Sequence, residues 1–94
     1  MNTYHKLKIS SYYFNDVANE IKTFEIRYND RDYRVGDFLQ LNEFDNITQR
    51  YTGRYVIARI LYILQNEKYL QHKCVGLAID VVAKHMTEMQ RSDP

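Results

Sequence analysis

Three side chains of complementary chemistry stand close together in the sequence: the ammonium of Lys22, the hydroxyl of Thr23 and the carboxylate of Glu25. A nearby cation lowers the cost of deprotonating a hydroxyl, and a carboxylate can act as a general acid or base. Such a set could hydrolyse an amide or a phosphodiester. An ordinary structural explanation also exists for Lys22, because a cation is favoured at the C-terminus of a helix.

A wider polar set in the same part of the chain suits the binding of an anion. Arg27 continues the alternation of Thr23 and Glu25, and its guanidinium can form two hydrogen bonds to a phosphate or pair with Glu25. The alternative is an ordinary half-exposed strand, in which Glu25 and Arg27 form a surface ion pair that contributes little. The candidate nucleic-acid-binding residues are His5, Lys8, Tyr13, Lys22, Arg27, Asp30 and Arg31.

The nine tyrosines add a second kind of contact. A tyrosine ring can stack on an unpaired base, but it can equally fill the core of a small domain. Tyr28 continues an apolar alternation and is expected to pack inward. The tyrosines near polar or turn segments are the candidates for stacking, namely Tyr12, Tyr13, Tyr33, Tyr51 and Tyr62.

The composition limits the classes of function. Thirteen Lys and Arg against twelve Asp and Glu give a net charge of +1, which suits recognition of a base or a short segment better than the wrapping of a long duplex. Cys74 is the sole cysteine, which excludes an intrachain disulfide and a multi-cysteine zinc site. His5, His72 and His85 are too scattered for a metal site. We expect no metal and no cofactor, since the sequence has no glycine-rich phosphate loop either.

Two features favour a cytoplasmic protein that does not enter membranes. The most apolar run, residues 55–64, is interrupted by Arg59 and is shorter than the roughly 20 apolar residues of a membrane helix. The single cysteine and the lack of a recognisable cleavable leader suggest a reducing compartment. The sequence leaves the oligomeric state open.

Two periodicities predict the elements that position the candidate residues. An apolar stripe at helical spacing from Phe14 to Ile21 predicts a helix over residues 11–21, with Ser10 and Ser11 at its N-cap. Alternating polar and apolar residues predict four strands, and the run over residues 54–64, with apolar groups on both faces, predicts a central or strongly curved one. These strands cover residues 5–9, 24–28, 38–44, 54–64 and 74–82.

Each alternating strand should bury one face and present the other. In the strand over residues 5–9, Leu7 and Ile9 share the buried face, and His5 and Lys8 lie near or on the exposed side. In the strand over residues 24–28, an inward Tyr28 would leave the polar set of Thr23, Glu25 and Arg27 on the presented face.

Five strands and an early helix predict a small α+β domain whose sheet curls into a partly closed β-barrel. The length permits one core, so residues 1–94 are expected to form a single domain. Residues 45–53 and 65–73 should contain loops, and residues 84–94 should form a polar C-terminal tail.

Several segments together resemble the ASCH domain of the PUA-like superfamily, and more closely a short phage and bacterial branch of it. The matching segments are His5-Lys6-Leu7-Lys8-Ile9, Lys22-Thr23-Phe24-Glu25-Ile26-Arg27, Asn29-Asp30-Arg31-Asp32-Tyr33 and Val35-Gly36-Asp37. The resemblance extends from residue 5 to about residue 80. It implies a PUA-like β-barrel with basic and acidic groups along a cleft. It also implies RNA or modified-nucleoside binding, and some ASCH relatives are small amidohydrolases or ribonucleases.

The resemblance assigns roles position by position. Lys22, Glu25 and Arg27 match the central motif of the family, and His5, Lys8, Asp30 and Arg31 match the narrower branch. Three features depart from the pattern, one of them the lack of an identifiable second glutamate far downstream. Glu20 stands where many ASCH sequences have glycine, and the amidohydrolase relatives place their threonine three residues after the lysine rather than next to it.

Three hypotheses follow for the function. The first is a module that binds RNA or a modified nucleoside in a cleft, with Lys8, Lys22, Arg27 and Arg31 as its cations. The second is a small hydrolase, either an amidohydrolase or a ribonuclease, in which Lys22, Thr23 and Glu25 act on a nucleoside or RNA. The third is an interaction domain without a small-molecule site.

Overall fold

The computed structural model describes residues 2–66 and 68–88, and these form one helix and a single five-stranded sheet. The chain enters the sheet through its first strand and the helix follows at once. The elements in chain order are β1 (Tyr4–Ser10), α1 (Ser11–Ala18), β2 (Phe24–Tyr28), β3 (Phe38–Asp45), β4 (Arg50–Leu64) and β5 (Cys74–His85).

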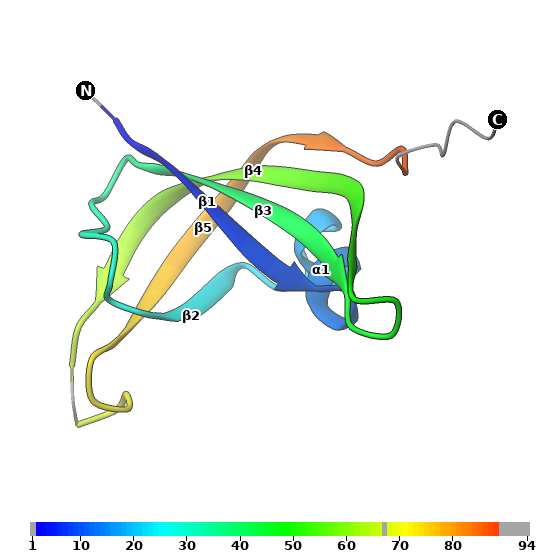
Figure 1. Ribbon diagram of the computed structural model, residues 1–94. Coiled ribbons are helices and arrows are strands. Elements are labelled where there is room, and N and C mark those ends of the chain that lie inside the picture. Colours follow the sequence, from blue (N-terminus) through cyan, green and yellow to red (C-terminus); the bar gives the residue numbers. More distant parts are fainter. Residues whose placement is uncertain (1, 67, 89–94) are drawn as a thin grey trace, which may run out of the picture.

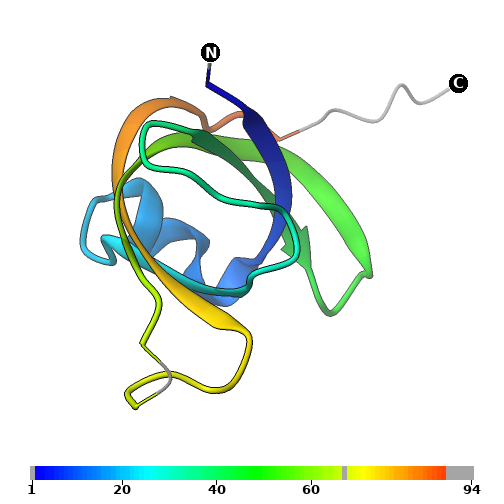
Figure 2. The same cartoon turned by 90° about the vertical axis from the view of Figure 1, so that its left-hand side faces the viewer.

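The sheet has the strand order β1-β3-β4-β5-β2, in which β1 runs parallel to β3 and all other neighbours are antiparallel. Figure 1 shows the strong twist of the sheet, and the end-on view in Figure 2 shows that it curls around a common centre. The two edge strands, β1 and β2, approach each other without pairing. The predicted α+β curled barrel is therefore confirmed, with an open seam between β1 and β2.

The core fills the inner side of the curl. Leu39, Leu41, Val56, Ile60 and Leu77 are fully buried, and they come from the three central strands. The helix α1 adds its own apolar stripe, which contacts β1, β3 and β5. The residues of this stripe are the fully buried Phe14, Val17 and Ala18.

The helix begins as predicted but ends early. The side chain of Ser10 caps it by accepting a hydrogen bond from the Tyr12 amide at 3.2 Å. The helix ends at Ala18 rather than at residue 21, because Glu20 has a φ of 59°, in the left-handed region, and turns the chain. This turn directs the following residues, Lys22 among them, toward β2.

The hairpin between β3 and β4 is tighter than the sequence predicts. The chain reverses over residues 46–49, and β4 starts at Arg50, which pairs with Asp45. Residues 51–53, expected in a loop, therefore belong to the strand. The cause is the antiparallel pairing of the two strands, which shifts register between Asn42 and Phe44 and resumes with Phe44 opposite Tyr51 before the turn.

The last strand is also longer than predicted. β5 continues to His85, which pairs with Tyr55 of β4. Lys84, expected in the polar tail, extends from the sheet to the helix and donates to the Ala18 carbonyl at 3.0 Å. This carbonyl is one of the unpaired acceptors at a helix C-terminus, so the contact stabilises the end of α1. Residues 89–94 of the expected tail lie outside the described residues.

The buried and exposed faces of β2 are the reverse of the prediction. Phe24, Ile26 and Tyr28 are 52%, 55% and 62% exposed, whereas Glu25 is only 5% exposed. The register explains the reversal, because Glu25 pairs with the buried Leu77 of β5 and must share its inward face. Glu25 and Arg27 thus point into the curl, whereas Thr23 is exposed and Tyr28 does not pack inward.

No helix within residues 2–66 and 68–88 has the length and apolar content needed to cross a bilayer.

The left-handed backbone of Glu20 generates a prediction about stability. A side chain in this region costs about 1–2 kcal/mol, which glycine avoids, although glycine also raises the entropy of the unfolded chain. Glu20→Gly should therefore increase the free energy of unfolding by about 0.5–1 kcal/mol, measured by urea denaturation. Glu20→Ala is the control, because it removes the carboxylate but keeps the strain. An equal gain in both variants would place the effect in the charge and contradict the backbone explanation.

Candidate functional site

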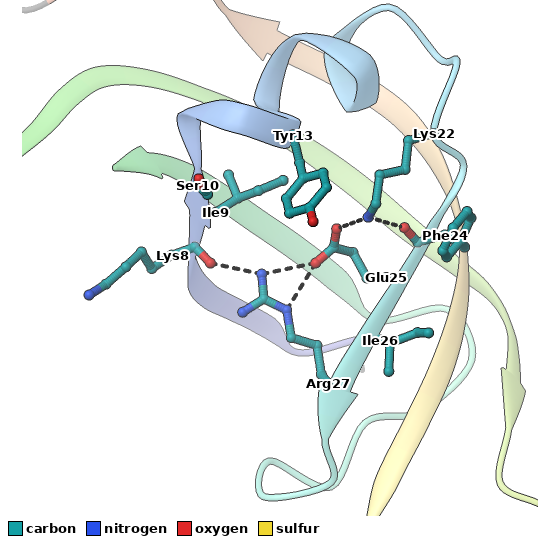
Figure 3. A pocket seen from close by; sticks show the side chains of 9 residues that line it. All are labelled: Lys8, Ile9, Ser10, Tyr13, Lys22, Phe24, Glu25, Ile26 and Arg27. Atoms are coloured by element: carbon teal, nitrogen blue, oxygen red, sulfur yellow. Dashed lines mark hydrogen bonds and ion pairs between the residues drawn. The ribbon is translucent and has the colours of Figure 1, made fainter. Parts of the chain in front are cut away.

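A cavity of about 500 Å³ lies in the seam, between the end of β1, the start of α1 and β2. Figure 3 shows that the side chains of Glu25 and Arg27 point from β2 toward β1, while those of Phe24 and Ile26 project from the other side of the strand. The cavity is lined by Lys8, Ile9, Ser10, Tyr13, Lys22, Phe24, Glu25, Ile26 and Arg27. We call it the first cavity.

Glu25 holds two cations at the base of the first cavity. Its Oε1 accepts a hydrogen bond from Lys22 Nζ at 2.6 Å, and its Oε2 accepts one from Arg27 Nε at 2.9 Å. The side chains of Glu25, Lys22 and Arg27 are 6%, 19% and 23% exposed, so this is not a solvated surface pair. The interpretation of the polar alternation as ordinary strand surface is therefore wrong for these residues.

Arg27 also joins the two edges of the sheet. Its Nη2 donates to the backbone carbonyl of Lys8 at 2.8 Å, across the gap between β2 and β1. This carbonyl belongs to an edge strand and has no ladder partner on that side. The guanidinium thus replaces a strand-to-strand hydrogen bond at this point of the seam. Its orientation is fixed at both ends, by Glu25 and by Lys8.

Two aromatic rings flank the Lys22 ammonium. Its Nζ lies 5.5 Å from the centroid of the Tyr13 ring and 4.8 Å from that of Phe24. Tyr13 is 46% exposed, so part of its ring surface remains open. A flat, partly exposed ring beside a cation is suited to stacking against a planar group with a negative charge nearby.

Two smaller cavities continue along the seam. The second cavity, of about 250 Å³, shares Lys8 and Arg27 with the first and adds Asp30, Arg31 and Tyr33 among its lining residues. The third cavity, of about 290 Å³, shares Arg31 with the second and is also lined by residues around His5. The seam is therefore a row of hollows that runs between β1 and the chain from β2 to β3.

His5 is buried, contrary to the prediction that it lies on the exposed side of β1. It is 6% exposed, because it has the same parity as the inward Leu7 and Ile9. Its Nε2 lies 2.8 Å from Asp37 Oδ2, and its ring lies 4.8 Å from that of Tyr33. His5 therefore contributes to the wall of the third cavity from inside the fold.

Asp37 is a residue whose role the sequence analysis missed. Besides His5, it accepts hydrogen bonds from the backbone amides of Thr3 at 3.0 Å and Arg34 at 3.1 Å. Burial alone would raise the pKa of Asp37, but the hydrogen bonds from His5, Thr3 and Arg34 outweigh it and hold this pKa below its ordinary value. The Val35-Gly36-Asp37 segment indicated only a turn, and the long-range partners of Asp37 gave no local signal.

The remaining predicted residues take different positions. Lys8 contributes its backbone to the seam, while its Nζ points away and lies 4.2 Å from the centroid of the Phe44 ring. Thr23 is exposed and is not among the residues that line the three cavities. Tyr33 is buried at 6% exposure, so its ring is not a free stacking surface, and burial together with Asp30 raises its pKa. The exposed stacking candidates are Tyr12, Tyr13, Tyr51 and Tyr62.

A second buried ion pair joins Glu43 of β3 to Arg54 of β4. Glu43 accepts hydrogen bonds from Arg54 Nε at 2.7 Å and Nη2 at 2.8 Å and from the Thr52 hydroxyl at 2.6 Å. Burial alone would raise the pKa of Glu43, but these hydrogen bonds outweigh burial and hold this pKa below its ordinary value. The hydrogen bond to Glu43 in turn raises the pKa of Arg54. The Arg54 guanidinium stacks 4.9 Å from the centroid of the Phe14 ring. This pair joins β3 and β4 to α1 and has a structural role.

Within the described ranges, no three His, Cys, Asp or Glu side chains lie close enough together to hold a metal ion. In the first cavity, Glu25 is instead paired with Lys22 and Arg27.

Fold and site together define a small α+β protein with a partly buried cleft, lined by both charged and apolar groups, at the open seam of a curled sheet. A family model matches residues 4–79, and its description is "Domain of unknown function (DUF3850)". The match covers most of the chain, so the chain belongs to this family. No curated protein matches the sequence.

The contacts of Asp37 generate a prediction with a defined pH dependence. Because its folded-state pKa is lowered, its stabilisation is complete above the unfolded pKa of about 3.9 and is lost as the pH falls through the folded value. Asp37→Asn should lower the free energy of unfolding by about 1–3 kcal/mol at pH 7, since it disturbs several buried hydrogen bonds. The difference from the wild type should shrink below about pH 4.

Urea denaturation between pH 7 and pH 3 measures this difference. Asp16→Asn, which removes an exposed carboxylate from α1, is the matched control and should change stability little at any pH. A destabilisation by Asp37→Asn that stays constant over the whole pH range would contradict the electrostatic explanation.

Proposed function

We propose that the first cavity binds RNA or a modified nucleoside. The observation that carries this proposal is the convergence of two cations, a buried carboxylate and a partly exposed tyrosine ring on one hollow of about 500 Å³. This volume is within the ordinary range of small-molecule sites, roughly 300–1,000 Å³. The resemblance to ASCH domains supports the same class of ligand.

The chemistry of the cavity matches the parts of a nucleotide. Lys22 and Arg27 exceed the single charge of Glu25 by one positive charge, which suits one phosphate group. The carboxylate of Glu25 can accept hydrogen bonds from the amino or imino groups of a base. The ring of Tyr13 offers the base a face for stacking.

The hydrolase hypothesis has less support from the geometry. Its nucleophile would be the Thr23 hydroxyl, but Thr23 is exposed and lies outside the lining of the cavity. Lys22 and Glu25 remain in contact at 2.6 Å and could still assist a water molecule in attacking a bound substrate. Tests of RNA binding should therefore also measure hydrolysis of the bound substrate.

Removing the Lys22 charge should weaken RNA binding. Lys22→Ala should raise the Kd for a short single-stranded RNA about tenfold at low salt, measured by fluorescence anisotropy. It should also reduce the salt dependence by about 0.7 in the slope of log K against log salt, the effect of one lost phosphate contact. Lys6→Ala is the control, because Lys6 is exposed and is not among the lining residues of the three cavities. If both variants lose the same RNA affinity, the loss reflects the lower net charge of the protein and contradicts the proposal.

Glu25→Gln separates binding from catalysis. The substitution removes a negative charge while keeping the shape, so anion binding should be retained or become tighter. If Glu25 acts as an acid or base, the same variant should lose turnover of acylated cytidines or of RNA, followed by chromatography. Circular dichroism verifies that the variant is folded. Absence of both binding and turnover in the wild type would overturn the proposed function altogether.

A further inference from the structure

We propose that the seam binds an extended single strand of RNA over about three nucleotides, with one nucleotide at each cavity, rather than an isolated nucleoside. This inference rests on the proposed function and specifies its ligand. It comes from the order of the cavities along the seam, which the first cavity alone does not show.

The three cavities follow one line because the two edges of the sheet run in opposite directions. Relative to β3, β1 is parallel, β4 is antiparallel, β5 is parallel and β2 is antiparallel. Residues that descend along β1 therefore face residues that ascend along β2 and beyond. Ser10 lies with Lys22 and Glu25 in the first cavity, Leu7 with Asp30 in the second, and His5 with Asp32 in the third.

An arginine stands at each boundary between neighbouring cavities. Arg27 lines both the first and the second cavity, and Arg31 lines both the second and the third. The hydrogen bonds of Arg27 to residues in the described ranges use Nε and Nη2, which leaves Nη1 for a ligand. Arg31 is exposed. In a nucleic acid the phosphates lie between successive nucleosides, so cations at the boundaries match the spacing of the backbone.

A carboxylate lies within each cavity. Glu25 belongs to the first, Asp30 to the second, and Asp32 and Asp37 to the third. Carboxylates repel phosphates and accept hydrogen bonds from base amino groups. The cations within the cavities, Lys22 and Arg34, are paired with Glu25 and Asp32. The arginines at the boundaries and the carboxylates within the cavities therefore favour phosphates at the boundaries and bases in the hollows. Bases held in this way cannot be paired, which selects a single strand.

A free nucleoside would use only part of this arrangement. It would occupy the first cavity and would not reach Arg31, which lies at the boundary between the second and third cavities. The second and third cavities, of about 250 and 290 Å³, would then serve no ligand. A short strand engages all three.

The test is binding as a function of length, with 5′-phosphorylated RNAs of one, two, three and five nucleotides measured by calorimetry. We expect affinity to rise at each step up to three nucleotides, by about threefold or more per step, and to change little from three to five. Arg31→Gln should weaken the trinucleotide at least fivefold and leave the mononucleotide unchanged. Lys22→Gln should weaken both, and Lys6→Gln, the control outside the cavities, should weaken neither.

The outcomes distinguish the two levels of the proposal. If the mononucleotide binds as tightly as the trinucleotide, or if Arg31→Gln affects both equally, the extended-strand inference is overturned while the proposed function stands. An RNA hairpin that binds through its duplex as tightly as the single strand also overturns the inference. If no RNA of any length and no modified nucleoside binds, the proposed function itself fails, and the inference fails with it.

Discussion

The seam between β1 and β2 is the feature on which the rest of the structure depends. A curled sheet that closed completely would satisfy the backbone groups of both edges by strand pairing. Here the edges stay apart, and the Arg27 guanidinium spans them by bonding to the Lys8 carbonyl. Glu25 fixes the guanidinium by accepting a hydrogen bond from its Nε. The open seam, its polar lining and its cavities thus have one structural cause.

Placing charged groups in such a seam is unfavourable for the stability of the fold. Burying a carboxylate and two cations costs desolvation energy, which their mutual contacts only partly recover. The protein uses the same solution at Glu43 and Arg54, but there the pair is packed against Phe14 and joins elements of the core. Glu43 and Arg54 border a hollow of about 170 Å³, whereas the Glu25 cluster borders one of about 500 Å³. A cluster whose only purpose was stability would gain more from apolar residues that fill this space, so its chemistry points to a ligand.

The sequence predicted the elements better than their faces. Alternation identified four of the strands, because its period of two is visible without knowledge of the fold, and an apolar run identified the strand over residues 54–64. It could not state which set of β2 points inward, since Phe24, Ile26 and Tyr28 form an apolar set that would suit a core. The register with Leu77 decides the matter, and register is a long-range property. His5 could have been placed correctly, because it shares the parity of Leu7 and Ile9.

The candidate site was predictable in part for the same reason. Lys22, Glu25 and Arg27 are close in sequence, so their proximity needed only a turn and a strand, whereas the cavity that they border needed β1 to lie opposite. The contacts show why the cluster favours a ligand of mixed character. An anion alone would compete with Glu25 for Lys22 and Arg27 and would leave the carboxylate buried without partners. A ligand that brings a phosphate for the cations and hydrogen-bond donors for the carboxylate replaces both sets of contacts at once. Nucleotides carry both groups at a fixed separation, and this requirement for two complementary groups, more than net charge, would give the seam its selectivity.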